Sequence, residues 1–247
     1  QRNITGLCSD TYYEFSAWFK NICAACSSDS TGRTATGSPL FKSYLATKTL
    51  NDSSGVSPDV TFTIDGVNYY TSGSVTYDRR WVKKGFLFKT GPAQTSVTLT
   101  IRNNAPGGGG NDWAFDDVGL ATCLPSLTMR PSNTPTYCTN GQVDMSVIVN
   151  TFYNNYGLYQ WERSTDGGGS WHAAPELPGV QSYTYTFNGT SYLDTVAYPP
   201  IIATALTNGY KYRIKTATSL TNLSSSSCSV YNTVDVITIT VDGGCVV

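Results

Sequence analysis

Cysteine is the residue type that most constrains how this chain can fold. The chain of 247 residues has one histidine and seven cysteines, at positions 8, 23, 26, 123, 138, 228 and 245. A zinc site built from Cys and His ligands does not fit this set. A site of four cysteines needs two close pairs, and only Cys23 and Cys26 are close in sequence. Disulfides formed in an oxidising compartment are the better interpretation.

Short alternating apolar segments, bounded by turn residues, predict an all-β protein. In the first half they cover residues 12–19, 60–64, 67–70, 85–89, 96–102 and 113–120. No window shows convincing helical periodicity. No apolar run approaches the roughly 18 residues that a membrane-spanning helix needs.

The charge content is low and balanced. Charged residues make up 13% of the chain, about half the usual fraction of roughly 25%, and the formal net charge is −1. A global field that favours nucleic acid is therefore absent. The sequence starts Gln-Arg-Asn, without an initiator Met or a signal peptide. We expect a mature secreted form or a piece of a longer protein, and favour the piece.

A proline-rich stretch after Cys123 suggests a boundary between two modules, 1–123 and 124–247. About seven short strands are expected in the second module, as in a β-sandwich. They cover residues 142–150, 156–164, 170–173, 182–188, 193–198, 210–218 and 230–241. In an immunoglobulin-like sandwich, a Trp on the third strand packs on an inter-sheet disulfide. Trp161 fits that Trp, and the pairing expected here is Cys138 with Cys228, because strand 210–218 has no cysteine.

Several segments resemble secreted surface proteins of Bacteroidetes. Residues 159–171 read YQWERSTDGGGSW and resemble a strand, turn and Trp of immunoglobulin-like modules in these proteins. Residues 111–123 (NDWAFDDVGLATC) resemble the closing strand of jelly-roll domains of the MAM and carbohydrate-binding type. Segments 12–21, 62–66 and 102–108 also resemble the jelly-roll domains found in secreted proteins of Bacteroidetes. The resemblance implies a jelly-roll module followed by an immunoglobulin-like module, exported by the type IX system, in an adhesin linked to gliding or polysaccharide use.

In such jelly rolls, strands usually precede the one that here starts at residue 12. We therefore expect a jelly roll truncated at its N-terminus, with an open sheet edge. If the strand after Cys8 pairs antiparallel with the strand before Cys123, these two cysteines form a bridge. Cys23 and Cys26 then close a small loop, and Cys245 is left over. The alternative pairs Cys8 with Cys23 or Cys26.

A dense group of oxygen ligands in the first module suggests a structural calcium ion. The group comprises Asn111, Asp112, Asp116 and Asp117. Calcium takes six to eight oxygen ligands, and the resemblance implies an Asp from this last strand. Asp116 and Asp117 point to opposite faces of a strand, so both cannot bind one ion through side chains alone.

Exposed aromatic rings are candidates for stacking on sugars. The candidates for sugar binding are Tyr69, Tyr70, Trp81 and Trp113. For each of them, packing in the core is the alternative. The one basic cluster, at positions 79, 80, 83 and 84, suits a sulfated or uronic polysaccharide or is a solvated strand end. Ser30 and Thr195 match the short O-glycosylation pattern of Bacteroidetes.

The residues for catalysis are sparse. His172 is the only histidine and has no serine elbow near it, and glutamates occur only at positions 14, 162 and 176. We expect a non-enzymatic adhesin that binds polysaccharide or another cell-surface protein, or neighbouring domains of a longer chain, but not nucleic acid. The alternatives are a structural spacer or accessory subunit of a larger complex, and an accessory region of a secreted glycoside hydrolase.

Overall fold

The computed structural model describes residues 1–22, 57–75, 80–105, 112–132, 134–231 and 236–246. The chain forms two compact units. The first unit contains Gln1–Leu7, Tyr12–Thr90 and Gln94–Thr122; the second contains Cys8–Thr11, Gly91–Ala93 and Cys123–Val247. The main division, after Thr122, lies next to the expected boundary. The two short segments that belong to the second unit were not expected.

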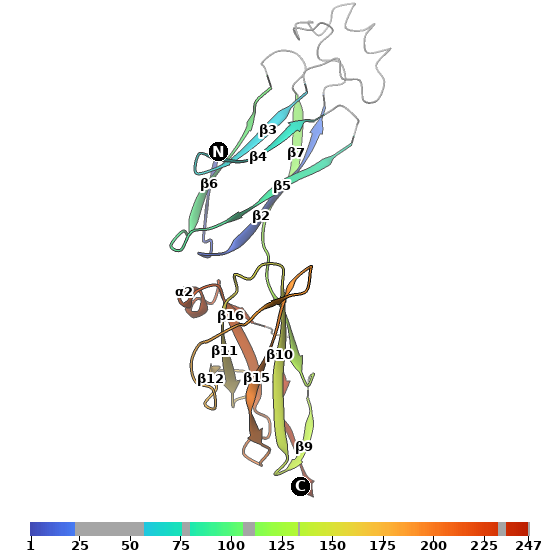
Figure 1. Ribbon diagram of the computed structural model, residues 1–247, viewed down its shortest axis with the longest axis vertical. Helices are drawn as coiled ribbons and strands as arrows, with labels where there is room; N and C mark the ends of the chain where they lie inside the picture. The colour runs from blue at the N-terminus through green and yellow to red at the C-terminus, as the bar shows by residue number, and fades with distance from the viewer. Residues whose placement is uncertain (23–56, 76–79, 106–111, 133, 232–235, 247) are drawn as a thin grey trace, which may run out of the picture. The chain divides into compact units, whose positions relative to one another are not determined.

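The first unit is a sandwich of two antiparallel sheets (Figure 1). One sheet has the order β1-β6-β3-β4 and the other β5-β2-β7. The strands are β1 (Arg2–Thr5), β2 (Tyr12–Asn21), β3 (Asp59–Ile64), β4 (Val67–Ser74), β5 (Val82–Lys89), β6 (Ser96–Asn103) and β7 (Trp113–Thr122). The all-β prediction is confirmed, and one strand, β1, does precede β2.

Period-two alternation in β2 explains how the two sheets pack. Tyr13, Phe15, Ala17 and Phe19 are buried, while the residues between them are more exposed. The rings of Phe15 and Phe19 lie 5.4 and 5.6 Å from that of Phe62 on the facing sheet. These contacts form the centre of the core of the first unit.

The second unit has the strand order of an immunoglobulin-like sandwich. One sheet is β14-β15-β10-β8 and the other β12-β11-β16-β17, with β13 on β11 and β18 on β16. These orders match the D-E-B-A and C′-C-F-G sheets of that fold. The strands are β8 (Ser126–Arg130), β9 (Thr136–Thr139), β10 (Gln142–Thr151), β11 (Leu158–Ser164), β12 (His172–Ala173), β13 (Gln181–Ser182), β14 (Thr186–Phe187), β15 (Tyr192–Ile202), β16 (Lys211–Ala217), β17 (Val230–Tyr231), β18 (Ile237–Thr238) and β19 (Thr240–Val246).

Trp161 lies at the centre of the second core, on β11, which takes the place of the third strand (C) of an immunoglobulin-like sandwich, as predicted. Its side chain is 0% exposed. Its ring lies 5.1 Å from that of Tyr198, which in turn lies 5.4 Å from Tyr212. Tyrosine rings from β15 and β16 therefore pack with Trp161 in this core.

The predicted pairing of Cys138 with Cys228 is wrong, and so is the expectation that Cys245 is left over. Cys138 bonds Cys245 (Cα–Cα 4.9 Å). Cys138 lies on β9, which pairs in parallel with β19 and places Asp242 opposite Cys138. The C-terminal strand therefore carries Cys245 to β9, and Figure 1 shows the C-terminus beside it.

The predicted bridge between Cys8 and Cys123 is also wrong, because Cys8 bonds Cys228 (Cα–Cα 5.5 Å). The strands pair antiparallel as expected, with Tyr13 opposite Thr122. However, Cys8 precedes β2 by four residues, in the segment that belongs to the second unit. Cys123 is half-buried after β7, and Cys23 and Cys26 lie outside the described residues.

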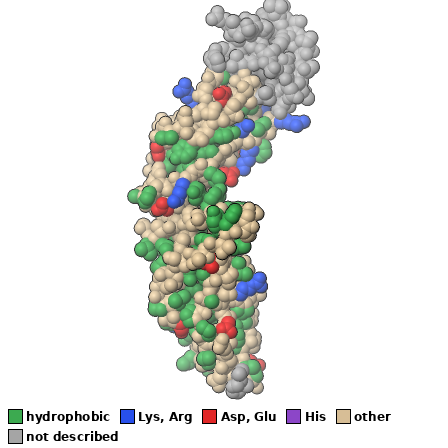
Figure 2. All heavy atoms as spheres, in the orientation of Figure 1, with side chains coloured by type: hydrophobic (Ala, Val, Ile, Leu, Met, Phe, Trp, Pro, Cys, Tyr) green, Lys and Arg blue, Asp and Glu red, His purple; other side chains and the backbone are tan. Residues whose placement is uncertain are grey.

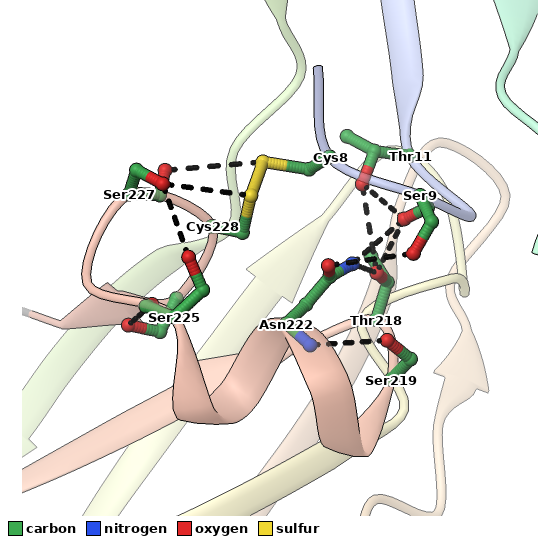
Figure 3. Close-up of a disulfide and its surroundings, with 10 residues drawn as sticks. Cys8, Ser9, Thr11, Thr218, Ser219, Asn222, Ser225, Ser227 and Cys228 are labelled. Carbon is green, nitrogen blue, oxygen red and sulfur yellow. Dashed lines mark hydrogen bonds between the residues drawn. A yellow bond between two sulfur atoms is a disulfide. The ribbon is translucent and has the colours of Figure 1, made fainter. Parts of the chain in front are cut away.

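A buried amide holds the Cys8 segment against the short helix α2 (Leu220–Ser224), which sequence periodicity missed because it has one turn. The Asn222 Nδ2 donates to the Ser9 carbonyl (2.7 Å) and to the Thr218 Oγ1 (2.6 Å). The Ser9 Oγ donates to the Asn222 Oδ1 (3.4 Å). Figure 3 shows these bonds beside the disulfide. Both ends of the amide are paired, as burial requires.

Candidate functional site

The four aromatic residues predicted to bind sugar do not form one surface. Tyr69 lies at a bulge of β4, and its ring contacts Phe86 (5.6 Å). Tyr70 and Trp113 pack against the first core. Trp81 is 41% exposed, with the Lys20 ammonium 5.8 Å from its ring centre. The structure brings them to separate places in the first unit.

The residues predicted to bind calcium are partly described. Asn111 lies outside the described residues. Asp112, Asp116 and Asp117 are exposed. Asp117 sits at a bulge with φ 48°, and its backbone N–H donates to the Asp116 Oδ1 (2.8 Å). Among the described residues, no group of three His, Cys, Asp or Glu side chains is placed to hold a metal ion. Calcium stays a prediction.

The predicted glycosylation sites and the predicted basic cluster are also only partly described. Ser30 lies outside the described residues, as does position 79, and Thr195 is exposed on β15. Lys83 forms an exposed ion pair with Glu14 (3.5 Å).

In the described part of the chain, no helix is long and apolar enough to cross a membrane.

The three glutamates considered for catalysis are held in ion pairs. His172 is exposed on β12, opposite Arg163 in the ladder. Glu176 accepts a hydrogen bond from the Tyr198 hydroxyl and lies 3.8 Å from the Arg163 guanidinium. Glu162 binds Arg213. Both glutamates of the second unit therefore form structural pairs.

The best-built candidate site is a cleft of about 530 Å³ on the outer face of the sheet β12-β11-β16-β17. We name it the Trp171 cleft. It is lined by Gly167, Gly168, Trp171, Lys211, Arg213, Tyr231, Val236 and Thr238. Sheet pairing brings these residues together: Lys211 is opposite Ser164 on β11 and Thr238 on β18. The cleft thus combines two aromatic rings with two basic side chains.

Arg213 is fixed at the centre of the cleft. The centre of its guanidinium group lies 4.1 Å from the Trp171 ring centre and 4.2 Å from the Tyr231 ring centre. Its Nε and Nη2 both lie 2.7 Å from the Glu162 Oε2. Both side chains are largely buried, at 14% and 9% exposure. Ring stacking and ion pairing together orient the guanidinium and with it the two rings.

The loop between β11 and β12 positions Trp171. The Asp166 carboxylate accepts hydrogen bonds from the Ser164 Oγ (2.6 Å) and the Ser170 Oγ (2.6 Å). These bonds hold the pKa of Asp166 well below its ordinary value, so the carboxylate stays charged. The Trp171 Nε1 donates to the Gly168 carbonyl (3.1 Å). Gly168 has φ 103°, which favours glycine, so the sequence Asp-Gly-Gly-Gly is suited to this loop.

Sequence reasoning did not identify this site. It placed Trp171 beside a turn and treated 210–218 as a strand, but it gave neither a binding role. The available signal is the run from Tyr210 to Lys215, in which basic residues alternate with apolar and aromatic ones. Such alternation predicts a strand with one basic face. The partner rings, Trp171 and Tyr231, come from distant parts of the chain.

No family profile matches the sequence, and no curated protein matches it at a significant level. The two disulfides among the described residues are typical of proteins of an oxidising, extracytoplasmic compartment.

Proposed function

We propose that this chain is a non-catalytic module pair of a secreted cell-surface adhesin, of the Bacteroidetes type IX-exported kind. It attaches to polysaccharide or surface partners through the Trp171 cleft. The observation that carries the proposal is the fixed stack of Arg213 with Trp171 and Tyr231 over an open cleft. Arg213 covers one face of each ring, and both residues are partly exposed. The aromatic surface left exposed suits sugar rings, because it is apolar and matches the C–H faces of a sugar.

Substitution of Trp171 tests this role of the cleft. We expect Trp171→Ala to lower the affinity of the full chain for its polysaccharide roughly fivefold or more, because one ring contact is worth about 1 kcal/mol or more. The ligand is first found by screening a polysaccharide array, and the affinity is then measured by calorimetry. Trp81→Ala is the matched control, since Trp81 is also an exposed tryptophan. Loss of binding in the control, with Trp171→Ala unaffected, contradicts the proposal.

A second candidate function, an accessory subunit held in a larger complex, is favoured by one side of the first unit. A cleft of about 430 Å³ separates β1 from the edge strand β7 and reaches the buried side chains of Phe15 and Leu99. Val118 lines this cleft but is 49% exposed, and Phe115, opposite the buried Phe19, is 54% exposed. A strand from a partner chain would cover both residues and pair with the edge of β7, whose one neighbouring strand in the described part of the chain is β2.

Amide hydrogen exchange tests the second candidate. In the isolated chain, we expect fast exchange along the edge of β7 that faces away from β2. In the complex recovered from the cell surface, the same amides become protected if a partner strand covers them. Equal exchange in both forms contradicts this function and leaves the adhesin proposal unaffected.

A further inference from the structure

A row of three basic side chains runs along the outer face of β16. Lys211, Arg213 and Lys215 alternate with Tyr212, Ile214 and Thr216, which are buried. Because strand residues rise about 3.3 Å each, neighbouring members of the row stand roughly 7 Å apart. The row passes through the Trp171 cleft and continues one position beyond it.

Two of the three charges in the row have no counterion among the described residues. Glu162 pairs with Arg213. Lys211 and Lys215 form no ion pair with any residue that the structure describes. The nearby loop residue Asp166 directs its carboxylate to hydroxyls of its own loop. Charges elsewhere are sparse, and on the face shown in Figure 2 they are scattered among uncharged side chains.

Aromatic rings stand beside Lys211 and Lys215. Tyr231 is opposite Lys215 in the β16–β17 ladder. A Cβ on Gly168 would lie 3.8 Å from both the Lys211 Nζ and the Trp171 ring, so glycine leaves the space between them open. A neutral sugar would use the rings but not the ammonium groups. A sugar with a carboxylate or sulfate group would use both, through charge-assisted hydrogen bonds.

Given the proposed role of the cleft in polysaccharide binding, on which this inference rests, we propose that its ligand is an acidic polysaccharide. The uronate or sulfate groups bind Lys211 and Lys215, while sugar rings stack on Trp171 and Tyr231. Arg213 is a positioning residue, because Glu162 already occupies its Nε and Nη2. The repeat of cations along β16 suits a polymer with repeated negative charges.

The experiment measures binding of the full chain to three polymers: polygalacturonate, dextran sulfate and neutral dextran. We expect binding to one or both acidic polymers and at least tenfold weaker binding to dextran. We expect the double variant Lys211→Gln, Lys215→Gln to lose about tenfold or more in affinity for the acidic polymer. The double variant Lys211→Arg, Lys215→Arg keeps both charges, and we expect it to retain the affinity. Preference between the two acidic polymers tells a carboxylate ligand from a sulfate ligand.

The control Lys83→Gln, Lys84→Gln removes the same charge from the first unit, and we expect it to bind normally. Binding to dextran that depends on Trp171 but not on the two lysines overturns the inference and keeps the proposed function. Binding to none of the polymers overturns the inference, whereas the polysaccharide array decides the proposed function separately. If the chain binds duplex DNA as tightly as the acidic polymers, and Trp171→Ala leaves that binding unchanged, the surface attracts any polyanion. That result also overturns the inference.

Discussion

Replacing Glu162 by Ala is expected to destabilise the second unit by about 3 kcal/mol. The substitution leaves the Arg213 guanidinium 14% exposed and without its carboxylate, and an uncompensated buried charge typically costs about 3–5 kcal/mol. We take the lower end because stacking on Trp171 and Tyr231 persists. For a unit of this size the melting temperature should fall by roughly 10 °C. Urea denaturation and calorimetry measure both quantities.

Glu14→Ala is the matched control, because Glu14 pairs with Lys83 at about half exposure on each side. An exposed pair contributes about 0–1 kcal/mol, so this variant should be nearly neutral. The double variant Glu162→Leu, Arg213→Leu should recover much of the lost stability, since it removes both charges. A Glu162→Ala variant as stable as Glu14→Ala would contradict the structural role given to the ion pair.

Strand positions were predictable because each strand buries one face. In β2 the alternation of Tyr13, Phe15 and Phe19 with smaller or polar residues is visible in the sequence, and the structure buries that set. Trp161 was predictable for the same reason, since it occupies the inner face of a strand at the position expected in such a sandwich. Local pattern and tertiary structure agree where a strand has one buried face and one exposed face.

The disulfides were not predictable because their partners depend on pairing between distant strands. Cys138 meets Cys245 only because β9 and β19 pair in parallel, which neither local sequence indicates. Cys8 meets Cys228 because a four-residue segment near the start of the chain belongs to the second unit. Cysteine spacing restricts connectivity but does not choose among pairings.

The Trp171 cleft illustrates the same limit for function. The alternation that places Lys211, Arg213 and Lys215 on one face can be read from the sequence. That the face is outward, and that Trp171 and Tyr231 lie against Arg213, depends on contacts across three strands and a loop. The local sequence around Trp171 or Tyr231 does not mark either residue as part of a stack, so a stack built from separate segments could not be predicted.

Removing the Cys8–Cys228 disulfide is the second change with a large expected effect. In Cys8→Ser, Cys228→Ser we expect the second unit to lose about 2–4 kcal/mol of stability, because the bond joins residues 220 positions apart and restricts the unfolded chain. The Asn222 hydrogen bonds remain, so the native segment should stay in place. Urea denaturation of oxidised protein measures the change, and a loss below about 1 kcal/mol would contradict it.

The Cys138→Ser, Cys245→Ser variant is the comparison, because its bond spans 107 positions. If the whole chain unfolds at once, the longer loop should make the Cys8–Cys228 bond worth about 0.6 kcal/mol more, since loop entropy grows by that amount per doubling. If the first unit stays folded while the second unfolds, β2 and β7 keep Tyr13 opposite Thr122. The free loop then runs only from Cys123 to Cys228, and the two variants should lose equal stability. The comparison therefore reports whether the two units unfold together.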